Sequence, residues 1–365
     1  MTDARCSYSM QGFTDVLVDG IIRLVLADSV GQDDKCVYLS HPNYVYTVRN
    51  RSELPNCSMD HSRLVVVSDT HDRHQKIGTL PDCDLLIHCG DIMMTSRHFS
   101  LKNCIQKLCS FNNWLLSCNA KQRIVLGGNH DHFLERIGAE RVQELLPSAV
   151  YLENSSYQYE GFSIWGTPLS NGRSPNRAFQ SPDFLKRTQE QKPKEVDILI
   201  THGLCEEITS TIDHKLHIWG HSHNSYGIRY PGDYVKVHSK LHPVHALSVC
   251  APIMNGRFKP RNLPVVIDIP KDTRKLNDIP NASDMVSHKY SARSGKFSKS
   301  KSQRYNATEI ESVAGENTNN DNGPTTSPSP NAELFVLSVA DKPLITGSTA
   351  TYFSLPVWNN RVVPE

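Results

Sequence analysis

The chain has 365 residues, enough for one large α/β domain with appendages or for two modest domains. Lys and Arg total 39 against 38 Asp and Glu, and the formal net charge of +1 does not favour binding to nucleic acid or to an acidic membrane surface. Residues 1–20 are polar and acidic, without the basic segment and apolar core of a signal peptide. No apolar run approaches the ~20 residues of a membrane span. We therefore expect no secretory signal, no membrane contact and a cytoplasmic location, with the nucleus as the alternative.

The ten cysteines are scattered along the chain, and none of them forms a C-x-x-C pair. A chain of this length does not need disulfides to hold a core. We expect reduced thiols.

The N-terminal part alternates apolar and polar positions over residues 12–48, with turn residues near positions 28–31 and 41–43. This pattern predicts a small antiparallel β element, followed by a polar connector over residues 51–61. Residues 1–61 are thus interpreted as a β-rich extension, either a decoration of the main domain or a small domain of its own.

The next segment repeats the order strand, polar loop, helix. Short apolar runs over residues 64–67, 84–89 and 123–126 predict buried strands, and helical spacing predicts helices over 101–118 and 132–146. This order is typical of a parallel sheet, in which ligands gather at the carboxyl ends of the strands. Further strands are predicted at 150–152, 157–159, 162–165, 196–200, 216–219, 226–229, 234–238, 246–249 and 265–269, with a loop at 171–176 and a helix at 179–190.

The composition changes after residue 270. Residues 271–333 are rich in Ser, Asn, Lys and Asp, so we expect a disordered linker. Its basic run over 288–304 is interpreted as a solvated tail, with a nuclear address, a phosphorylation region or a contact for an acidic surface as alternatives. Residues 334–365 begin with an apolar stretch to 356 that could supply one or two strands docking back onto the main domain, which we place at 62–270.

Five predicted strands end in side chains that bind metals. The glycine pair before Asn129 suits a loop that wraps closely around an ion or phosphate. Each cluster alone has an ordinary explanation, such as a helix cap or a satisfied histidine, but five strand ends of this kind are not plausibly independent turns. Carboxylate, imidazole and amide groups suit Mn, Fe, Zn or Mg, and the lack of cysteine disfavours a thiolate zinc site. The candidate ligands are Asp69, His71, Asp91, Asn129, His202, His221 and His223.

These motifs (Asp-x-His, Gly-Asp, Gly-Asn-His-Asp, His-Gly and Gly-His-x-His) resemble those of the calcineurin-like metallophosphoesterases. Residues 68–71, 164–168 and 220–223 resemble more closely the metallophosphoesterase-domain-containing branch, which is similar to class III cyclic-nucleotide phosphodiesterases. The resemblance covers about residues 62–270. It implies an α/β fold built as a four-layer α/β/β/α sandwich of two mixed sheets, carrying a two-metal site.

The resemblance also implies a role for each candidate residue. His130 would face the phosphate as the catalytic residue, stabilising or protonating the leaving oxygen. Asp131 would either orient His130 or cap the following helix. Asp91 would bridge the two metals, of which one would be bound by Asp69, His71, Asp91 and His223, and the other by Asp91, Asn129, His202 and His221.

The expected activity is metal-dependent hydrolysis of small phosphodiesters such as cyclic nucleotides. The cofactors would be two divalent ions, with Mn²⁺ expected and Fe, Zn or Mg as alternatives. Residues 90–95 lack the extended Gly-Asp-x-x-Asp-x-Gly pattern of protein phosphatases, but a phosphomonoesterase or a non-catalytic nucleotide-binding module stays open. A small phosphoester is the expected partner rather than nucleic acid, and the oligomeric state is left open.

Several other residues near the motifs are candidates for smaller roles. Arg97 and Arg173 are candidate phosphate contacts on loops around the site, with a plain surface role as the alternative. We interpret the remaining nearby histidines as supporting or packing residues: His74, His88, His98, His132 and His217.

Overall fold

The computed structural model describes residues 17–18, 21–22, 34–42, 44–94, 100–172, 174–237 and 239–285. All of them fall within one unit, Met1–Lys296. The basic run at 288–304, the apolar stretch at 334–356 and most of the expected linker lie outside the described residues. None of the described helices combines the length and the apolar content that crossing a bilayer requires.

The first large sheet has seven strands in the order β4-β3-β17-β5-β6-β7-β8. Its central strands are Val-, Leu- and Ile-rich runs whose side chains are buried on both faces, as expected for strands covered on both sides. Most neighbours are parallel, but β17 runs antiparallel to β5 and β4 antiparallel to β3. The strands are β3 (Lys35–Ser40), β4 (Val45–Asn50), β5 (His61–Val67), β6 (Cys83–His88), β7 (Ala120–Val125), β8 (Val150–Tyr151) and β17 (Val265–Pro270).

The second large sheet has six strands in the order β13-β16-β12-β11-β10-β9. Its central strands are parallel, and both edges are antiparallel. The strands are β9 (Ser155–Tyr159), β10 (Phe162–Thr167), β11 (Glu195–Thr201), β12 (Asp213–Trp219), β13 (Gly227–Arg229) and β16 (Leu247–Cys250). Two separate hairpins pair β1 (Leu17–Val18) with β2 (Ile21–Ile22) and β14 (Tyr234–Val237) with β15 (Lys240–Pro243).

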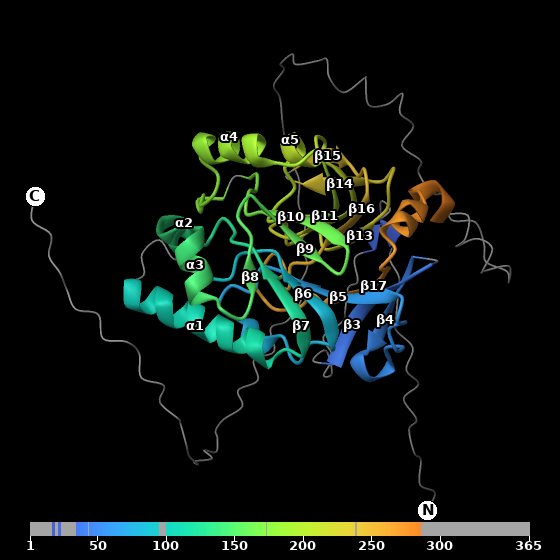
Figure 1. Cartoon of the computed structure of the whole chain (residues 1–365), viewed down its shortest axis with the longest axis horizontal. Coiled ribbons are helices and arrows are strands. Elements are labelled where there is room, and N and C mark those ends of the chain that lie inside the picture. The colour runs from blue at the N-terminus through green and yellow to red at the C-terminus, as the bar shows by residue number, and fades with distance from the viewer. Residues whose placement is uncertain are drawn as a thin grey trace, which may run out of the picture. The chain divides into compact units, whose positions relative to one another are not determined.

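The two large sheets pack face to face, with helices outside them (Figure 1). Alternate residues of each strand face opposite ways: Leu64 and Val66 join the apolar core between the sheets, whereas Val65 and Val67 face the helices. The inner core also contains Ile198 and Ile218 from the second sheet. This arrangement is the four-layer α/β/β/α sandwich of two mixed sheets that the family resemblance implied.

Helices α1 (Leu101–Ser117), α2 (His132–Ile137) and α3 (Ala139–Leu145) lie beside the seven-stranded sheet, and α4 (Pro182–Gln191) and α5 (Glu206–Thr209) lie beside the six-stranded sheet (Figure 1). Ser100 and Ser181 cap α1 and α4 by accepting hydrogen bonds from Asn103 N and Phe184 N. Short 3-10 turns occur at Arg51–Glu53, His74–Lys76 and Thr273–Asp278.

Two predicted helices have other boundaries. The continuous helix predicted over 132–146 is broken at Gly138, whose φ of +79° ends α2 and starts α3. The helix predicted from residue 179 begins at Pro182, because Phe179 has a left-handed backbone with φ +59° and Ser181 provides the cap.

The ends of the described chain pack onto the sandwich. Strand β3 pairs in parallel with β17, so the β3–β4 hairpin extends the seven-stranded sheet. The expectation of disorder from residue 271 is wrong for residues 271–285: Leu276 and Met285 are buried in the core between the sheets. Two apolar side chains in a polar segment are enough to anchor it there, which composition alone did not reveal.

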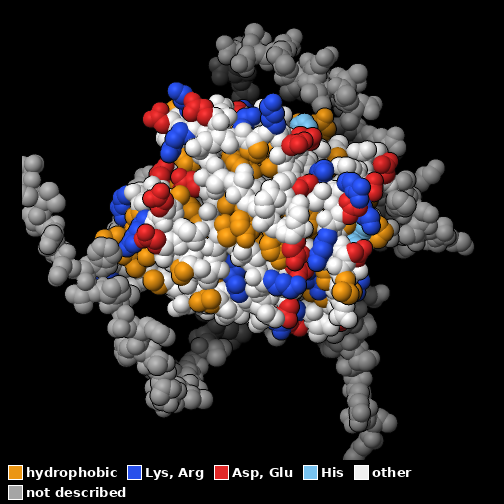
Figure 2. Space-filling model, viewed as in Figure 1, with side chains coloured by type: hydrophobic (Ala, Val, Ile, Leu, Met, Phe, Trp, Pro, Cys, Tyr) orange, Lys and Arg blue, Asp and Glu red, His pale blue; other side chains and the backbone are white. Residues whose placement is uncertain are grey.

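The strand register brings the predicted ligand loops together. Val67, His88 and Val125 are neighbours across β5, β6 and β7, so the loops after these strands leave the same edge. In the second sheet, Ile200 on β11 pairs with Ile218 on β12 in the same way. On the face shown in Figure 2, acidic and basic side chains are interspersed, as the near-zero net charge suggests.

Candidate metal centre

The seven-stranded sheet contributes ligands from three consecutive loops. Asp69 and His71 follow β5, Asp91 follows β6, and Asn129 follows β7, and all four side chains are buried. Asp69, His71 and Asp91 have φ values of +54°, +45° and +54°. Left-handed backbone at such residues costs on the order of 1–3 kcal/mol each, and it clusters where function requires a particular side-chain direction.

The six-stranded sheet contributes three histidines. His202 follows directly after β11, and His221 and His223 follow β12. His202 is fully buried, while the other two are partly exposed. The structure therefore brings all seven candidate ligands to one place between the ends of the two sheets.

Glycines allow the loops to approach one another. A Cβ on Gly220 would lie 2.0 Å from Ser68 Oγ and 2.4 Å from Asp69 Oδ2, and a Cβ on Gly128 would lie 2.3 Å from Asp91 Oδ1. These distances leave no room for any side chain. Gly128 belongs to the pair predicted to permit close backbone approach and does so here, and Gly220 does the same after β12.

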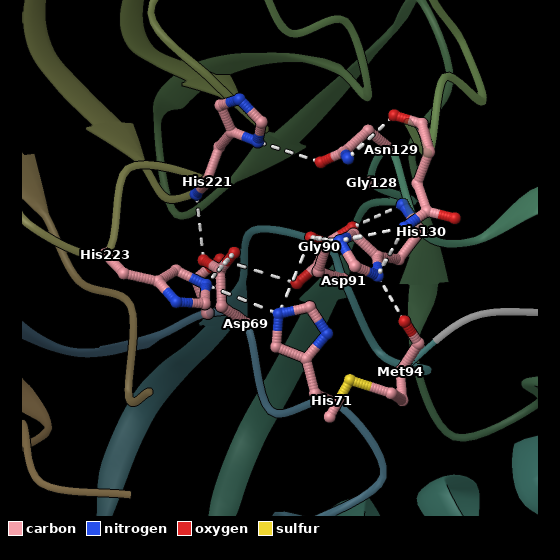
Figure 3. Close-up of polar contacts among 12 residues, drawn as sticks. Asp69, His71, Gly90, Asp91, Met94, Gly128, Asn129, His130, His221 and His223 are labelled. Carbon is pink, nitrogen blue, oxygen red and sulfur yellow. Dashed lines mark hydrogen bonds and ion pairs between the residues drawn. The ribbon is translucent and has the colours of Figure 1, made fainter. Parts of the chain in front are cut away.

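Hydrogen bonds between the loops orient the ligands (Figure 3). The backbone N–H of His221 donates to Asp69 Oδ2 at 2.9 Å, and the N–H of His130 donates to Asp91 Oδ1 at 2.8 Å. His202 Nδ1 donates to the carbonyl of Cys89 at 2.7 Å. The first and last of these bonds join the two sheets, so each sheet fixes a ligand of the other.

The ligand atoms converge in two neighbouring groups. In the first, His223 Nε2 lies 3.3 Å from both Asp69 Oδ1 and His71 Nε2. In the second, Asn129 Oδ1 lies 3.0 Å from His202 Nε2 and 2.8 Å from His221 Nδ1. Asp91 lies between them, with Oδ2 3.7 Å from His71 Nε2 and Oδ1 3.3 Å from His202 Nε2. The placement matches the two ligand sets implied by the resemblance, with Asp91 shared.

The donor set fits metal ions. His71, His202 and His223 each place Nδ1 against a backbone carbonyl, of Met93, Cys89 and Asn255 respectively. A carbonyl can only accept, so Nδ1 carries the hydrogen and the Nε2 lone pair of each neutral ring faces the centre. Two lone pairs 3.3 Å apart, between His71 and His223, repel each other unless a cation or a proton lies between them.

The carboxylates keep their charge in this buried place. Burial alone would raise the pKa of Asp91, but His202, His130 and His71 hold it well below its usual value. Burial lowers the pKa of His202, yet Asp91 outweighs that effect and raises it to about 9. In the absence of metal, His202 is therefore protonated on Nε2, and this proton faces Asp91 Oδ1 at the candidate metal position.

His130 lies beside Asp91 and His71 at the centre (Figure 3). Its Nδ1 is hydrogen-bonded to the carbonyl of Met94, and its Nε2 lies 4.0 Å from Asp91 Oδ2. Asn176 Nδ2 lies 3.4 Å from the same Nε2. His130, His71 and Asp91 are also close enough together to hold an ion. The ring is thus adjacent to the ligands, with a nitrogen directed at the space above Asp91.

Asp131 has neither of the two predicted roles. Its buried carboxylate accepts hydrogen bonds from the backbone N–H groups of Gly128, Ile92 and Met93, at 2.9, 3.1 and 2.9 Å. It makes no side-chain cap to α2. Asp131 instead ties the loop after β6 to the loop after β7, while a backbone carbonyl orients His130.

The remaining candidates divide into supporting residues and residues outside the described part. His88, His74 and His217 bond to Thr70, Ser110 and Thr201, which fits their predicted supporting role. Arg97, His98 and Arg173 lie outside the described residues.

Sequence reasoning missed three residues next to the centre: Met94, Asn176 and Phe258. Met94 acts through its backbone, so its residue type carries no signal. Asn176 and Phe258 lie on loops that reach the site only through the fold, since Phe258 is 128 positions from His130 in the chain. A pattern of neighbouring residues could not identify them.

The sequence is similar to those of known phosphoesterases and related proteins. A family described as calcineurin-like phosphoesterase matches residues 62–225. Metallophosphoesterase domain-containing protein 1 of Homo sapiens is 29% identical over 293 aligned residues, covering 64% of this chain and 83% of that protein. The UPF0046 protein C25E10.12 of Caenorhabditis elegans is 28% identical, covering 49% of this chain and 75% of that protein. A crystal structure of TT1561 of Thermus thermophilus covers 52% of this chain and 88% of that chain at 12% identity, and its TM-score of 0.34 is too low to support any inference.

Proposed function

We propose that this chain hydrolyses small phosphodiesters such as cyclic nucleotides. Residues 62–225 match the calcineurin-like phosphoesterases, which are metal-dependent hydrolases of phosphoric esters, and the structure holds clustered candidate metal ligands. We further propose that it uses two divalent ions, with Mn²⁺ as the first candidate. The observation that carries this proposal is the pair of ligand groups on either side of Asp91.

Each of the two ligand groups would hold one divalent cation. Two bound cations would supply an activated water and neutralise charge on the phosphate oxygens. The protein's own contribution is to fix the direction of every ligand before substrate arrives, through the bonds to Asp69, His71, Asp91, His202 and His223 described above. Preorganisation of this kind avoids the cost of reorienting dipoles during the reaction.

We assign to His130 the role of acting on the leaving group. The Met94 carbonyl fixes the hydrogen on Nδ1, so Nε2 is the nitrogen that faces the centre and exchanges a proton there. Asn176 Nδ2 is near both ring nitrogens and limits rotation of the ring. In this role His130 would donate a proton to the departing oxygen, a contribution of roughly 10²–10⁴ in rate.

A diester carries one negative charge on its phosphate, whereas a monoester carries up to two, so a diester needs fewer cationic side chains beside the metals. Arg73, which follows the ligand loop of β5, is engaged elsewhere: its Nη1 donates to the carbonyl of Phe258 at 2.6 Å. Separately, residues 90–95 lack the extended pattern of protein phosphatases, which disfavours a phosphoprotein substrate.

The decisive variant is Asp91→Ala, since Asp91 is the residue shared by both groups. With the full chain and added Mn²⁺, we expect hydrolysis of bis(p-nitrophenyl) phosphate to fall at least about 10³-fold, because both metals lose a ligand. Metal content, measured by mass spectrometry, should fall in parallel. Asp183→Ala, which removes an exposed carboxylate from the first turn of α4, is the matched control.

Retained activity in Asp91→Ala would refute the two-metal assignment. A panel of cyclic nucleotides, aryl diesters and aryl monoesters then tests the substrate class. Faster hydrolysis of monoesters would favour the phosphomonoesterase alternative, and metal-dependent nucleotide binding without turnover would favour the regulatory module.

A further inference from the structure

The loop Asn255–Lys259 is built against the metal centre by a closed set of hydrogen bonds. Asn255 Oδ1 accepts from the backbone N–H groups of Arg257 and Lys259, at 2.9 and 3.2 Å, and Asn255 N donates to Lys259 O at 2.9 Å. The carbonyl of Asn255 accepts from Nδ1 of His223 at 3.0 Å. The loop therefore has a fixed shape and is attached directly to a metal ligand.

Phe258, within this loop, has an unfavourable backbone conformation. Its φ is +54°, which is rare for a bulky side chain and strained. Two bonds hold it there: Arg73 Nη1 donates to its carbonyl at 2.6 Å, and its own N–H donates to Asn255 O at 2.8 Å. Strain that the surrounding structure maintains in this way points to a role for the side chain that it positions.

The Phe258 ring packs on the centre itself. Its centroid lies 5.0 Å from the rings of both His71 and His223, at angles of 66° and 75°, and 6.2 Å from the ring of His130. Phe258 is only partly buried and belongs to none of the three apolar clusters formed by the described residues. The ring therefore borders the space above the ligands rather than filling the core.

The residues on either side of Phe258 are cationic. Arg257 and Lys259 are exposed, and neither pairs with a carboxylate among the residues that the structure describes. An aromatic ring flanked by unneutralised positive charge is the combination by which proteins bind nucleotides without reading the base: the base stacks and the charge attracts the phosphate.

We propose that Phe258 is a specificity-determining residue that stacks against the base of a nucleoside phosphodiester, so that the site prefers nucleoside esters to alkyl esters of the same leaving group. This inference rests on the proposed phosphodiesterase function. A ring 5.0 Å from two ligand histidines is within reach of the organic group attached to a phosphate at the centre. Because stacking acts on the bound substrate and not on the bond that breaks, its effect falls mainly on KM.

Two chromogenic diesters with the same leaving group test the proposal: thymidine 5′-(p-nitrophenyl phosphate) and methyl p-nitrophenyl phosphate. With the full chain and Mn²⁺, we expect kcat/KM to favour the nucleoside ester by about tenfold or more. Phe258→Ala should remove this preference through KM and leave hydrolysis of the methyl ester within about threefold of the wild type. Phe258→Trp should retain the preference, and Tyr234→Ala, an exposed aromatic on β14, should not change it.

Calorimetric binding of thymidine 5′-monophosphate and methyl phosphate gives a second readout independent of turnover, and Phe258→Ala should weaken only the former. The proposal is overturned if the wild type shows no preference, if Phe258→Ala slows both esters equally, or if Phe258→Trp loses the preference. Equal slowing would show that the ring only packs on His71 and His223. Hydrolysis of neither ester by the wild type would instead refute the proposed function itself.

Discussion

The two sheets contribute chemically different halves of the metal centre. The seven-stranded sheet supplies every candidate oxygen ligand, from Asp69, Asp91 and Asn129, together with one imidazole from His71. The six-stranded sheet supplies only imidazoles, from His202, His221 and His223. All the fixed negative charge is thus on one side, and the other side is neutral or, when protonated, positive.

Neither half orients its own ligands alone. The backbone of His221 in the second half holds the Asp69 carboxylate, and the carbonyl of Cys89 in the first half holds the His202 ring. Because these bonds cross between the sheets, the geometry depends on how closely the sheets approach at this edge. Disturbing that approach should damage both halves together, whereas a change on one side should leave the other intact.

The largest effect is expected from Gly220→Ala, at the contact between the halves. The new methyl group would lie 2.0 Å from Ser68 Oγ and 2.4 Å from Asp69 Oδ2, so the loops must separate. We expect loss of both metals and destabilisation of several kcal/mol, of the size seen for overpacked or broken buried networks. Metal analysis and thermal unfolding measure the two effects.

Gly138→Ala is the matched control. Gly138 has a positive φ, at +79°, and a Cβ there would meet nothing within 4 Å. It should therefore show only the backbone cost, roughly 1 kcal/mol, with metal content unchanged. Full metal content in Gly220→Ala would show that the two halves do not depend on close approach.

A smaller, one-sided effect is expected from His130→Ala. His130 is held by the carbonyl of Met94, within the first half, and from the second half it contacts Asn176, which is not a candidate ligand. Turnover of a diester should fall about 10²–10⁴-fold while both metals stay bound. The control is His242→Ala. His242 lies on the hairpin strand β15 and pairs with Glu206. Loss of both metals in His130→Ala would make His130 a ligand or a structural residue instead.

The sequence predicted the strand ends and the order of the ligands because both are local. An apolar run followed at once by Asp, His or Asn can be seen within ten residues of sequence. In a parallel sheet the carboxyl ends of the strands then lie at one edge. The same local logic failed at Gly138, where one residue with positive φ divides a helix that otherwise has continuous periodicity.

Contacts between distant residues could not be predicted in this way. Asp131 bonds to the backbone of Ile92 and Met93, which lie 39 and 38 positions away in the sequence. Neither role predicted from its sequence neighbours, orienting His130 or capping α2, is therefore correct. Leu276 and Met285 are buried although the segment around them is polar. In each case the partner is supplied by the fold, and the residue type alone does not reveal it.

The smallest expected effect tests the difference in charge between the halves in the metal-free protein. His202 in the folded state has a pKa raised to about 9, against about 6.5 in an unfolded chain. A raised histidine pKa stabilises the folded state fully below pH 6.5, and this stabilisation is lost as the pH rises through 9. The pKa of His223 is also raised, chiefly by Asp69 acting against burial, and contributes in the same direction.

With EDTA present, we therefore expect the melting temperature to fall by a few degrees between pH 6.5 and 8.5, corresponding to about 2 kcal/mol. Asp69 and Asp91 stay ionised across this window, because their pKa values are lowered. Burial and the charge of Asp91 raise the pKa of Asp131 to about 8, so Asp131 adds a decline of its own in the same window. Buried cysteines ionise on unfolding near the top of the window and add a decline that does not depend on His202. His202→Gln separates the decline due to His202 from the declines due to Asp131 and the cysteines, since it removes the histidine contribution. In the metal-loaded protein a cation replaces the proton, so the decline should shrink to that of His202→Gln. An equal decline in metal-free wild type and His202→Gln would show that the charge on the second half does not stabilise the first.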